Sequence, residues 1–390
     1  MAIRLPKAAA IIAAVIALPL GAGAATAAPG SKPAPVTVES ASQAKAFAKL
    51  IHQRSTAHAT PRATAKAAPS PQAEAAARTA RLAGADRYAT SVAVSKVSYD
   101  DKQLLGGTLI VASGLQFPDA LAGGPAAAGL GGPLLLVPPT GTIPASVVTE
   151  IRRLGVESVV ILGGTSAVSS GVEDQLAKVV DYVDRVFGDD RYATAAFASY
   201  LTWKFDEANP DAEPTPPSVV YVTSGTTFAD ALAGGAAGAI VGAPLMLTNP
   251  TRLPDVTSFA LEDTDPAEIR ILGSTAAVSA NVANQIAQAV PNAKITRLGG
   301  ADRYATAAAV ASNLNLRTGG VVMLANGLNF PDALSASTSS AVINAPVLLV
   351  KQSCAPAATI TAVNHLAPTL IRAIGSAAVV SNNALAGKPC

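Results

Sequence analysis

Three copies of the pentapeptide Asp-Arg-Tyr-Ala-Thr place an acid beside a guanidinium, at residues 86–90, 190–194 and 302–306. An arginine can hold a phosphate or a carboxylate through two parallel hydrogen bonds, which a lysine cannot do. The pentapeptide therefore predicts an anion-binding position in each copy. It also has a purely structural interpretation, because Asp caps helices and Arg pairs with neighbouring carboxylates.

A second acid follows each pentapeptide, within the strings SGLQFPDAL, SGTTFADAL and NGLNFPDAL, as Asp119, Asp230 and Asp332. Each of these residues lies where an apolar strand gives way to a helix, which is where open α/β sheets bind ligands. An acid at a helix N-terminus also stabilises the helix directly, so both interpretations stay open. A nucleophile at the serine that opens the first two strings, Ser113 or Ser224, is excluded, because the third copy has Asn326 at that position.

A Gly-Gly-Thr loop at 163–165 follows a strand and precedes a helix, as phosphate-binding loops do. It lacks the GxGxxG spacing and the GK[ST] ending, and the later copies have Ser274 and Ser376 in place of its second glycine. A tight turn is therefore the better interpretation. The three histidines share no spacing and no HExxH or CxxC occurs, so the sequence predicts neither a metal nor a cofactor.

The elements that must position these residues alternate in the same way in each copy. In the first copy, strands are expected at 108–113, 134–137 and 158–162, with helices at 87–96, from 118, at 143–154 and at 172–180. Uninterrupted Val/Ile/Leu strands between helices indicate parallel sheets covered on both faces. The predicted fold class is α/β, with three tandem small doubly wound (Rossmann- or Toprim-like) modules, mostly parallel sheets and pseudo-three-fold packing.

The period of the copies sets the domain organisation, since about 100 residues is a common domain size. The predicted modules are 81–184, 185–296 and 297–390. Residues 29–80 predict an Ala/Pro-rich basic linker, largely disordered, with one helix near 40–53. The extended segment at Arg81 either fills the strand missing after the third module, which would close a ring, or belongs to the module it precedes.

Residues 1–28 predict a secretory signal peptide, because Arg4 and Lys7 precede an apolar run that ends in small residues. No membrane span is expected in the mature protein. The chain has two cysteines, Cys354 and Cys390. In an oxidising compartment a disulfide between them is expected, with two free thiols as the alternative.

The net charge of +2 is unevenly distributed, because the N-terminal residues 1–80 are basic, with nine Lys and Arg and two Glu. The rest of the chain has 24 acidic and 19 basic residues. Nucleic-acid binders usually carry a basic face on their folded part, so nucleic acid is excluded as a partner. Three-fold repetition favours multivalent binding over a single catalytic centre.

The strings RLAGADRYAT (81–90), FPDAL (117–121), PLLLV (133–137) and ILGGTSAVS (161–169), with their later counterparts, resemble the type 2 cell-wall-binding repeat family. The resemblance covers about residues 81–390. It implies three α/β modules in a pseudo-three-fold arrangement that attach Gram-positive surface-layer and wall proteins non-covalently to anionic secondary wall polymers. The positions it implies for ligand contact are Arg81, Asp86, Arg87, Asp119, Arg185, Asp190, Arg191, Asp230, Arg297, Asp302, Arg303 and Asp332.

These features predict a secreted, non-catalytic protein of the cell wall or cell surface. Its expected partner is an anionic secondary wall polymer or a peptidoglycan-linked glycan, bound through three repeats. Two alternatives stay open: a secreted wall hydrolase built on the α/β scaffold, and a structural surface-layer component.

Overall fold

The computed structural model describes residues 36–38, 40–57, 78–104, 106–204 and 213–390. The predicted signal peptide and most of the predicted linker lie outside these residues.

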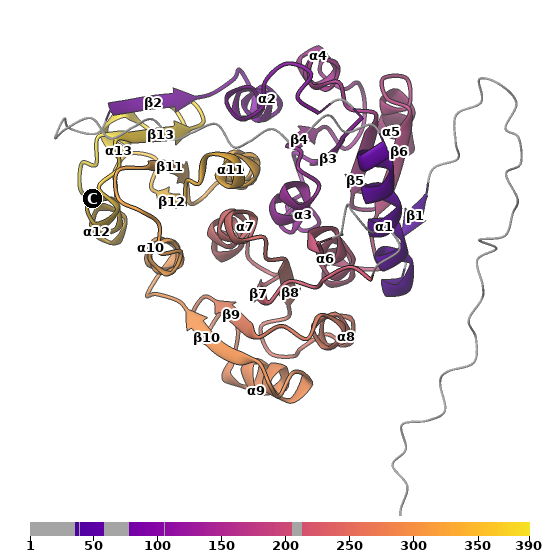
Figure 1. Cartoon of the computed structure of the whole chain (residues 1–390). Coiled ribbons are helices and arrows are strands. Elements are labelled where there is room, and N and C mark those ends of the chain that lie inside the picture. The colour runs from indigo at the N-terminus through magenta and orange to yellow at the C-terminus, as the bar shows by residue number, and fades with distance from the viewer. Residues whose placement is uncertain (1–35, 39, 58–77, 105, 205–212) are drawn as a thin grey trace, which may run out of the picture. The chain divides into compact units, whose positions relative to one another are not determined.

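Three parallel sheets carry the repeated strings (Figure 1). The first contains β1 (Thr37–Val38), β3 (Thr108–Ser113), β4 (Leu134–Val137), β5 (Ser158–Leu162) and β6 (Tyr182–Val186), in the order β1-β6-β5-β3-β4. The second contains β7 (Val219–Ser224), β8 (Leu245–Thr248), β9 (Glu268–Leu272) and β10 (Lys294–Leu298), in the order β10-β9-β7-β8. The third contains β2 (Arg78–Leu82), β11 (Val321–Asn326), β12 (Val347–Val350) and β13 (Leu370–Ile374), in the order β12-β11-β13-β2.

Helices follow the strands in each module, as the alternating sequence pattern predicts. The helix expected from residue 118 begins only at Gly123, because residues 118–122 form turns, so Asp119 lies before the helix and not in its first turn. The first module has α2 (Arg87–Ser98), α3 (Gly123–Gly129), α4 (Ala145–Leu154) and α5 (Ser170–Leu176). The second has α6 (Arg191–Ser199), the short 3₁₀-helix η1 (Tyr200–Thr202), α7 (Ala229–Val241), α8 (Asp255–Thr264) and α9 (Ala280–Ala289). The third has α10 (Arg303–Asn313), α11 (Phe330–Ile343), α12 (Ala357–Leu366) and α13 (Asn382–Leu385). Because all strand pairings within the three sheets are parallel, the predicted fold class is confirmed.

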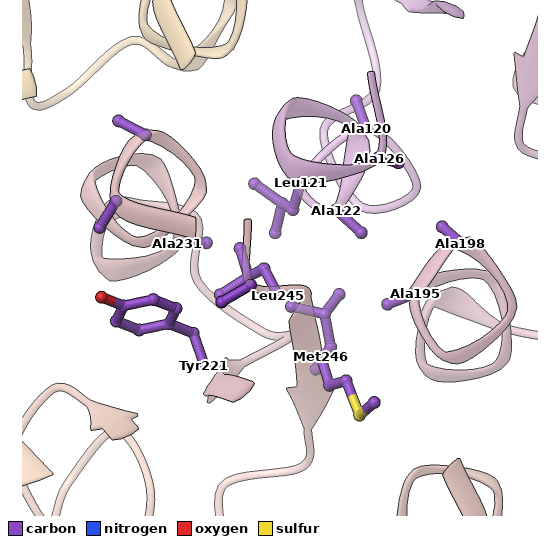
Figure 2. Packing of buried hydrophobic residues seen from close by; sticks show 14 of the residues in the cluster. Ala120, Leu121, Ala122, Ala126, Ala195, Ala198, Tyr221, Ala231, Leu245 and Met246 are labelled. Atoms are coloured by element: carbon purple, nitrogen blue, oxygen red, sulfur yellow. The ribbon is translucent and has the colours of Figure 1, made fainter. Parts of the chain in front are cut away.

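Helices α3, α7 and α11 pack against one another where the three modules meet (Figure 1). Small residues allow this close approach: a Cβ on Gly124 would lie 2.2 Å from the Ser337 hydroxyl oxygen. One hydrophobic cluster draws residues from all three modules. Figure 2 shows part of it, with Leu121 of the first module above Leu245 and Met246 of the second. The modules therefore share a core.

The last strand of each sheet belongs to the start of the next sequence repeat. β6 continues from the first sheet directly into α6 of the second module, and β10 leads into α10 of the third in the same way. β2 pairs with β13 in the third sheet, with Arg81 beside Ala373, and then leads into α2 of the first module. The first alternative for the Arg81 segment is therefore correct: this strand completes the third sheet.

The segment before the repeats contains β1 and α1 (Ala41–Ala57). β1 pairs with β6 at the edge of the first sheet, and α1 packs against α6 and η1. The helix expected near 40–53 is confirmed, and it buries Phe47 and Ile51. Asp184 of β6, itself buried, accepts hydrogen bonds from the Val36 amide and the Arg54 guanidinium, at 2.8 and 2.7 Å. These bonds fasten the segment to the edge of the first sheet.

The predicted disulfide joins Cys354, after β12, to Cys390. A backbone hydrogen bond from the Ala355 amide to the Lys388 carbonyl lies beside it. Among the described residues, no helix has the length and apolar character that a membrane span requires.

Candidate functional site

The aspartate of each pentapeptide caps the helix that follows it. The Asp86 carboxylate accepts a hydrogen bond from the Ala89 amide at 2.7 Å. Asp190 and Asp302 each accept two such bonds from the first turns of α6 and α10. These bonds satisfy amide groups that a helix start otherwise leaves unpaired. The structural interpretation accounts for these three carboxylates, and all three stay exposed at the surface.

The arginine of each pentapeptide bonds a glycine carbonyl in its own module. Nη1 of Arg87, Arg191 and Arg303 donates to the carbonyls of Gly114, Gly225 and Gly327 at 2.6, 2.7 and 2.7 Å. The guanidinium of Arg191 lies 5.9 Å from the centre of the Phe117 ring in the preceding module. Arg303 lies 6.0 Å from the ring of Phe228 in the same way. The arginine of one module therefore reaches the preceding module.

The aspartates of the FPDAL-type strings are the acids that these arginines face. Burial raises the pKa of Asp119, while a hydrogen bond from Thr194 and the charge of Arg191 oppose the increase. Burial likewise raises the pKa of Asp230, opposed by Thr306 and Arg303. Each carboxyl group of one module thus interacts with the pentapeptide of the next.

The third such pairing joins the third module to the first. Asp332 is only 6% exposed, and burial raises its pKa to about 6, against the opposing charge of Arg87. We call these three groups the junction clusters. They consist of Asp119, Arg191 and Thr194; Asp230, Arg303 and Thr306; and Asp332 with Arg87.

The glycine turns after β5, β9 and β13 press against the same aspartates. Gly163, Gly273 and Gly375 have φ values of 103°, 94° and 102°. A Cβ on Gly273 would lie 2.4 Å from a carboxylate oxygen of Asp230, and one on Gly375 would lie 2.3 Å from Asp332. Both the backbone conformation and the contact therefore require glycine. This geometry supports the tight-turn interpretation of the Gly-Gly-Thr loop.

The arginines that open the repeats hold these turns in place. Nη1 of Arg81, Arg185 and Arg297 donates to the carbonyls of Gly375, Gly163 and Gly273 at 2.8, 2.7 and 3.0 Å. Arg185 also pairs with Glu173 at 2.6 Å. The guanidinium groups of Arg81, Arg185 and Arg297 therefore bind the backbone of the glycine turns. Arg87, Arg191 and Arg303 are instead the ones that face the FPDAL aspartates.

Three phenylalanines lie together where the junction clusters converge. The ring centres of Phe117 and Phe228 are 5.4 Å apart, those of Phe117 and Phe330 are 5.7 Å apart, and those of Phe228 and Phe330 are 5.9 Å apart. We call this group the phenylalanine triangle. Neither these rings nor the two threonines of the junction clusters were expected as site residues. Their recurrence at one position of each repeat was the signal that could have revealed them.

The side chains of this region suit binding. They combine guanidinium, carboxyl and hydroxyl groups with aromatic rings. Such a combination binds ligands that carry polar groups and also have one apolar face. No group of three or more His, Cys, Asp or Glu side chains in the described part of the chain is arranged to hold a metal ion.

The family model of the cell wall binding domain 2 (CWB2) matches residues 81–173, 185–283 and 297–385. The chain belongs to this family. The resemblance found in the sequence is therefore confirmed, and membership supports cell wall binding and a location at the wall or cell surface.

Two curated relatives come from Bacillus subtilis. The N-acetylmuramoyl-L-alanine amidase LytC is 28% identical over 261 residues, which is 67% of this chain and 48% of the relative. The amidase enhancer is 30% identical over 303 residues, which is 78% of this chain and 39% of the relative. The chain thus spans less than half the length of either protein.

Two solved structures from Clostridium difficile share the fold. Cwp6 superposes with a TM-score of 0.69 at 23% identity, over 85% of this chain and 51% of Cwp6. Cwp8 superposes with a TM-score of 0.67 at 26% identity, over 78% of this chain and 50% of Cwp8.

Proposed function

We propose that this protein is secreted and binds non-covalently, without catalysing a reaction, to an anionic secondary polymer or peptidoglycan-linked glycan of a Gram-positive wall. The observation that carries the proposal is that, at all three module junctions, the charge of a pentapeptide arginine acts on the buried FPDAL-type aspartate of the preceding module. A guanidinium has five N–H donors, and its bond to a glycine carbonyl uses one of them. The remaining donors suit the phosphate or carboxylate groups of an anionic polymer.

The three junctions argue for binding because they repeat the same residue types. A hydrolytic centre needs one constellation in which a nucleophile or an acid–base pair is singled out. Here the arginine, the FPDAL aspartate and the phenylalanine occur three times. Weak contacts repeated on one molecule give useful retention on a polymeric surface.

The test is co-sedimentation of the predicted mature chain, residues 29–390, with purified Bacillus subtilis walls before and after dilute-acid extraction of their secondary polymers. We expect retention before extraction and loss of retention after it. The triple variant Arg87→Gln, Arg191→Gln and Arg303→Gln should bind weakly. The charge-matched control Lys96→Gln, Arg152→Gln and Lys178→Gln changes exposed cations at or just after the C-terminal ends of α2, α4 and α5, and should bind normally.

Equal retention on both wall preparations would exclude the secondary polymer as the partner. Equal losses in the two triple variants would show that net charge, and not the junction clusters, drives retention.

One observation favours the hydrolase alternative. A buried acid with a pKa near 6, such as Asp332, is what a general acid requires. This alternative predicts release of new reducing ends or amino groups from walls by the wild-type protein, abolished in Asp332→Asn. We expect no release from either protein.

A further inference from the structure

Two exposed leucines lie close in sequence to the phenylalanine triangle. The large hydrophobic side chains that stand exposed in the described residues are Leu115, Val241, Phe259 and Leu328. Leu115 is 54% exposed and Leu328 is 64% exposed, and each lies two residues before a phenylalanine of the triangle. The second module has Thr226 at the same position, so two of the three loops present an apolar side chain there. A contiguous apolar area on a surface marks an interaction site.

Polar side chains alternate with these apolar ones. Gln116, Thr227 and Asn329 directly precede the three phenylalanines, and all three are exposed. Each loop therefore presents a hydrogen-bonding side chain next to an aromatic ring, and the arginines of the junction clusters lie over two of the rings.

The phenylalanines of the three modules are too close together to act as three separate binding sites. The ring centres of the triangle are 5.4 to 5.9 Å apart and the ring planes are inclined by 57° to 63°, so each ring contacts both of the others at an angle. A six-membered sugar ring placed on one phenyl group would extend over its neighbours. Three sugars cannot each occupy one ring without colliding.

We propose that the three junction clusters form a single surface that takes one sugar unit of the wall glycan, with the ring face of the sugar on the phenylalanine triangle. The C–H groups on one face of a pyranose match the negative face of an aromatic ring. Amide and hydroxyl side chains satisfy the sugar hydroxyls at its edge. An acidic substituent is held by one of the three arginines.

This inference rests on the proposed function, and it adds that one protein chain holds one polymer chain. The occupant is assigned from the combination of aromatic rings, exposed amide groups and guanidinium groups at one place. An exclusively apolar partner would leave these polar groups unpaired, which costs free energy.

The first experiment is a calorimetric titration of residues 29–390 with short, size-fractionated fragments of the acid-released polymer from Bacillus subtilis walls. We expect about one fragment bound per protein chain. Three equivalent fragments per chain would overturn the single surface and leave the proposed function intact. No binding of fragments or of whole walls would overturn both.

The second experiment uses substitutions that leave the core untouched. The double variant Leu115→Asn and Leu328→Asn should bind the fragments at least about tenfold more weakly, because it removes apolar area that the ligand covers. The matched control is Val241→Asn and Phe259→Asn, whose side chains are 43% and 55% exposed, at the C-terminal end of α7 and on α8. It should bind like the wild type.

Equal affinities of the two double variants would overturn the inference. Sedimentation of both proteins gives an independent check. If the wild type were a dimer and Leu115→Asn with Leu328→Asn a monomer, the surface would be an interface between copies of this chain, and the sugar assignment would be wrong.

Discussion

Substitution of Asp332 by Asn should stabilise the protein at neutral pH. Asp332 is nearly fully buried at the junction of the third and first modules. Its surroundings favour the neutral carboxyl group, because burial raises its pKa to about 6 in spite of Arg87. Asparagine has nearly the same shape and cannot ionise, so it avoids the cost of a buried charge.

The size of the effect follows from proton linkage. The pKa of Asp332 is about 6 in the folded chain and 3.8 without the fold. Each pKa unit corresponds to about 1.36 kcal/mol, so ionisation of Asp332 costs the folded state about 3 kcal/mol. Since the folded pKa is the higher one, the folded chain keeps a proton that the unfolded chain loses between about pH 4 and 6. Stability therefore falls as the pH rises through this window.

The assay is urea unfolding followed by circular dichroism at pH 4 and pH 7.5. At pH 7.5 we expect Asp332→Asn to be more stable than the wild type by up to about 3 kcal/mol. Near pH 4 the difference should nearly vanish, because the wild-type carboxyl group is then protonated. Asp230→Asn is the matched control, and its gain should be smaller because Thr306 and Arg303 both oppose the rise in the pKa of Asp230.

Lower stability of Asp332→Asn at pH 7.5 would refute the reasoning, because it would show that the Asp332–Arg87 pair outweighs the burial of the charge. A gain in stability accompanied by loss of wall binding would show that the carboxyl group of Asp332 takes part in binding. Residues that cost stability are kept for function more often than for the fold.

Three further substitutions test other parts of the structure. Cys390→Ser opens a disulfide between residues 36 apart and should lower the free energy of unfolding by about 3–4 kcal/mol, measured with urea. Gly273→Ala should destabilise the protein more than Gly242→Ala in thermal unfolding; both glycines have positive φ, but only the first would place a Cβ against the carboxylate of Asp230. Asp184→Asn should speed amide exchange in α1, because it weakens the hold of β6 on that segment.

The local features of this fold were predictable because they depend on short stretches of sequence. The aspartate at position 86 and its two counterparts cap helices, as their chemistry requires. The apolar strands and the helices between them follow from their periodicity. The sequence allows two placements of β2, because parallel pairing joins residues far apart in sequence and no local signal selects the partner strand.

The site was predictable in its residue types and not in its pairings. Arg191 and Asp119 both belong to repeated strings, but the strings do not say that an arginine reaches the acid of the preceding module. Arg81 was expected to contact ligand, and the structure shows it bound to the Gly375 carbonyl. One phenylalanine in each repeat gives no sequence signal for a binding site. The contact among the three rings forms only when the three modules pack together.

The offset between sheets and repeats explains why the junctions are alike and why one of them is the most vulnerable. At the first two junctions, the chain runs without a break from a module's own strand into the helix that carries the next arginine. At the third, the strand that leads to Arg87 is joined to its sheet by pairing with β13 and by the hydrogen bonds of Arg81. The junction that contains Asp332 is thus held by non-covalent contacts alone. The charge of Asp332 should also affect stability more than the charge of either counterpart, because Arg87 opposes the rise in its pKa, whereas a threonine and an arginine oppose it at Asp119 and Asp230.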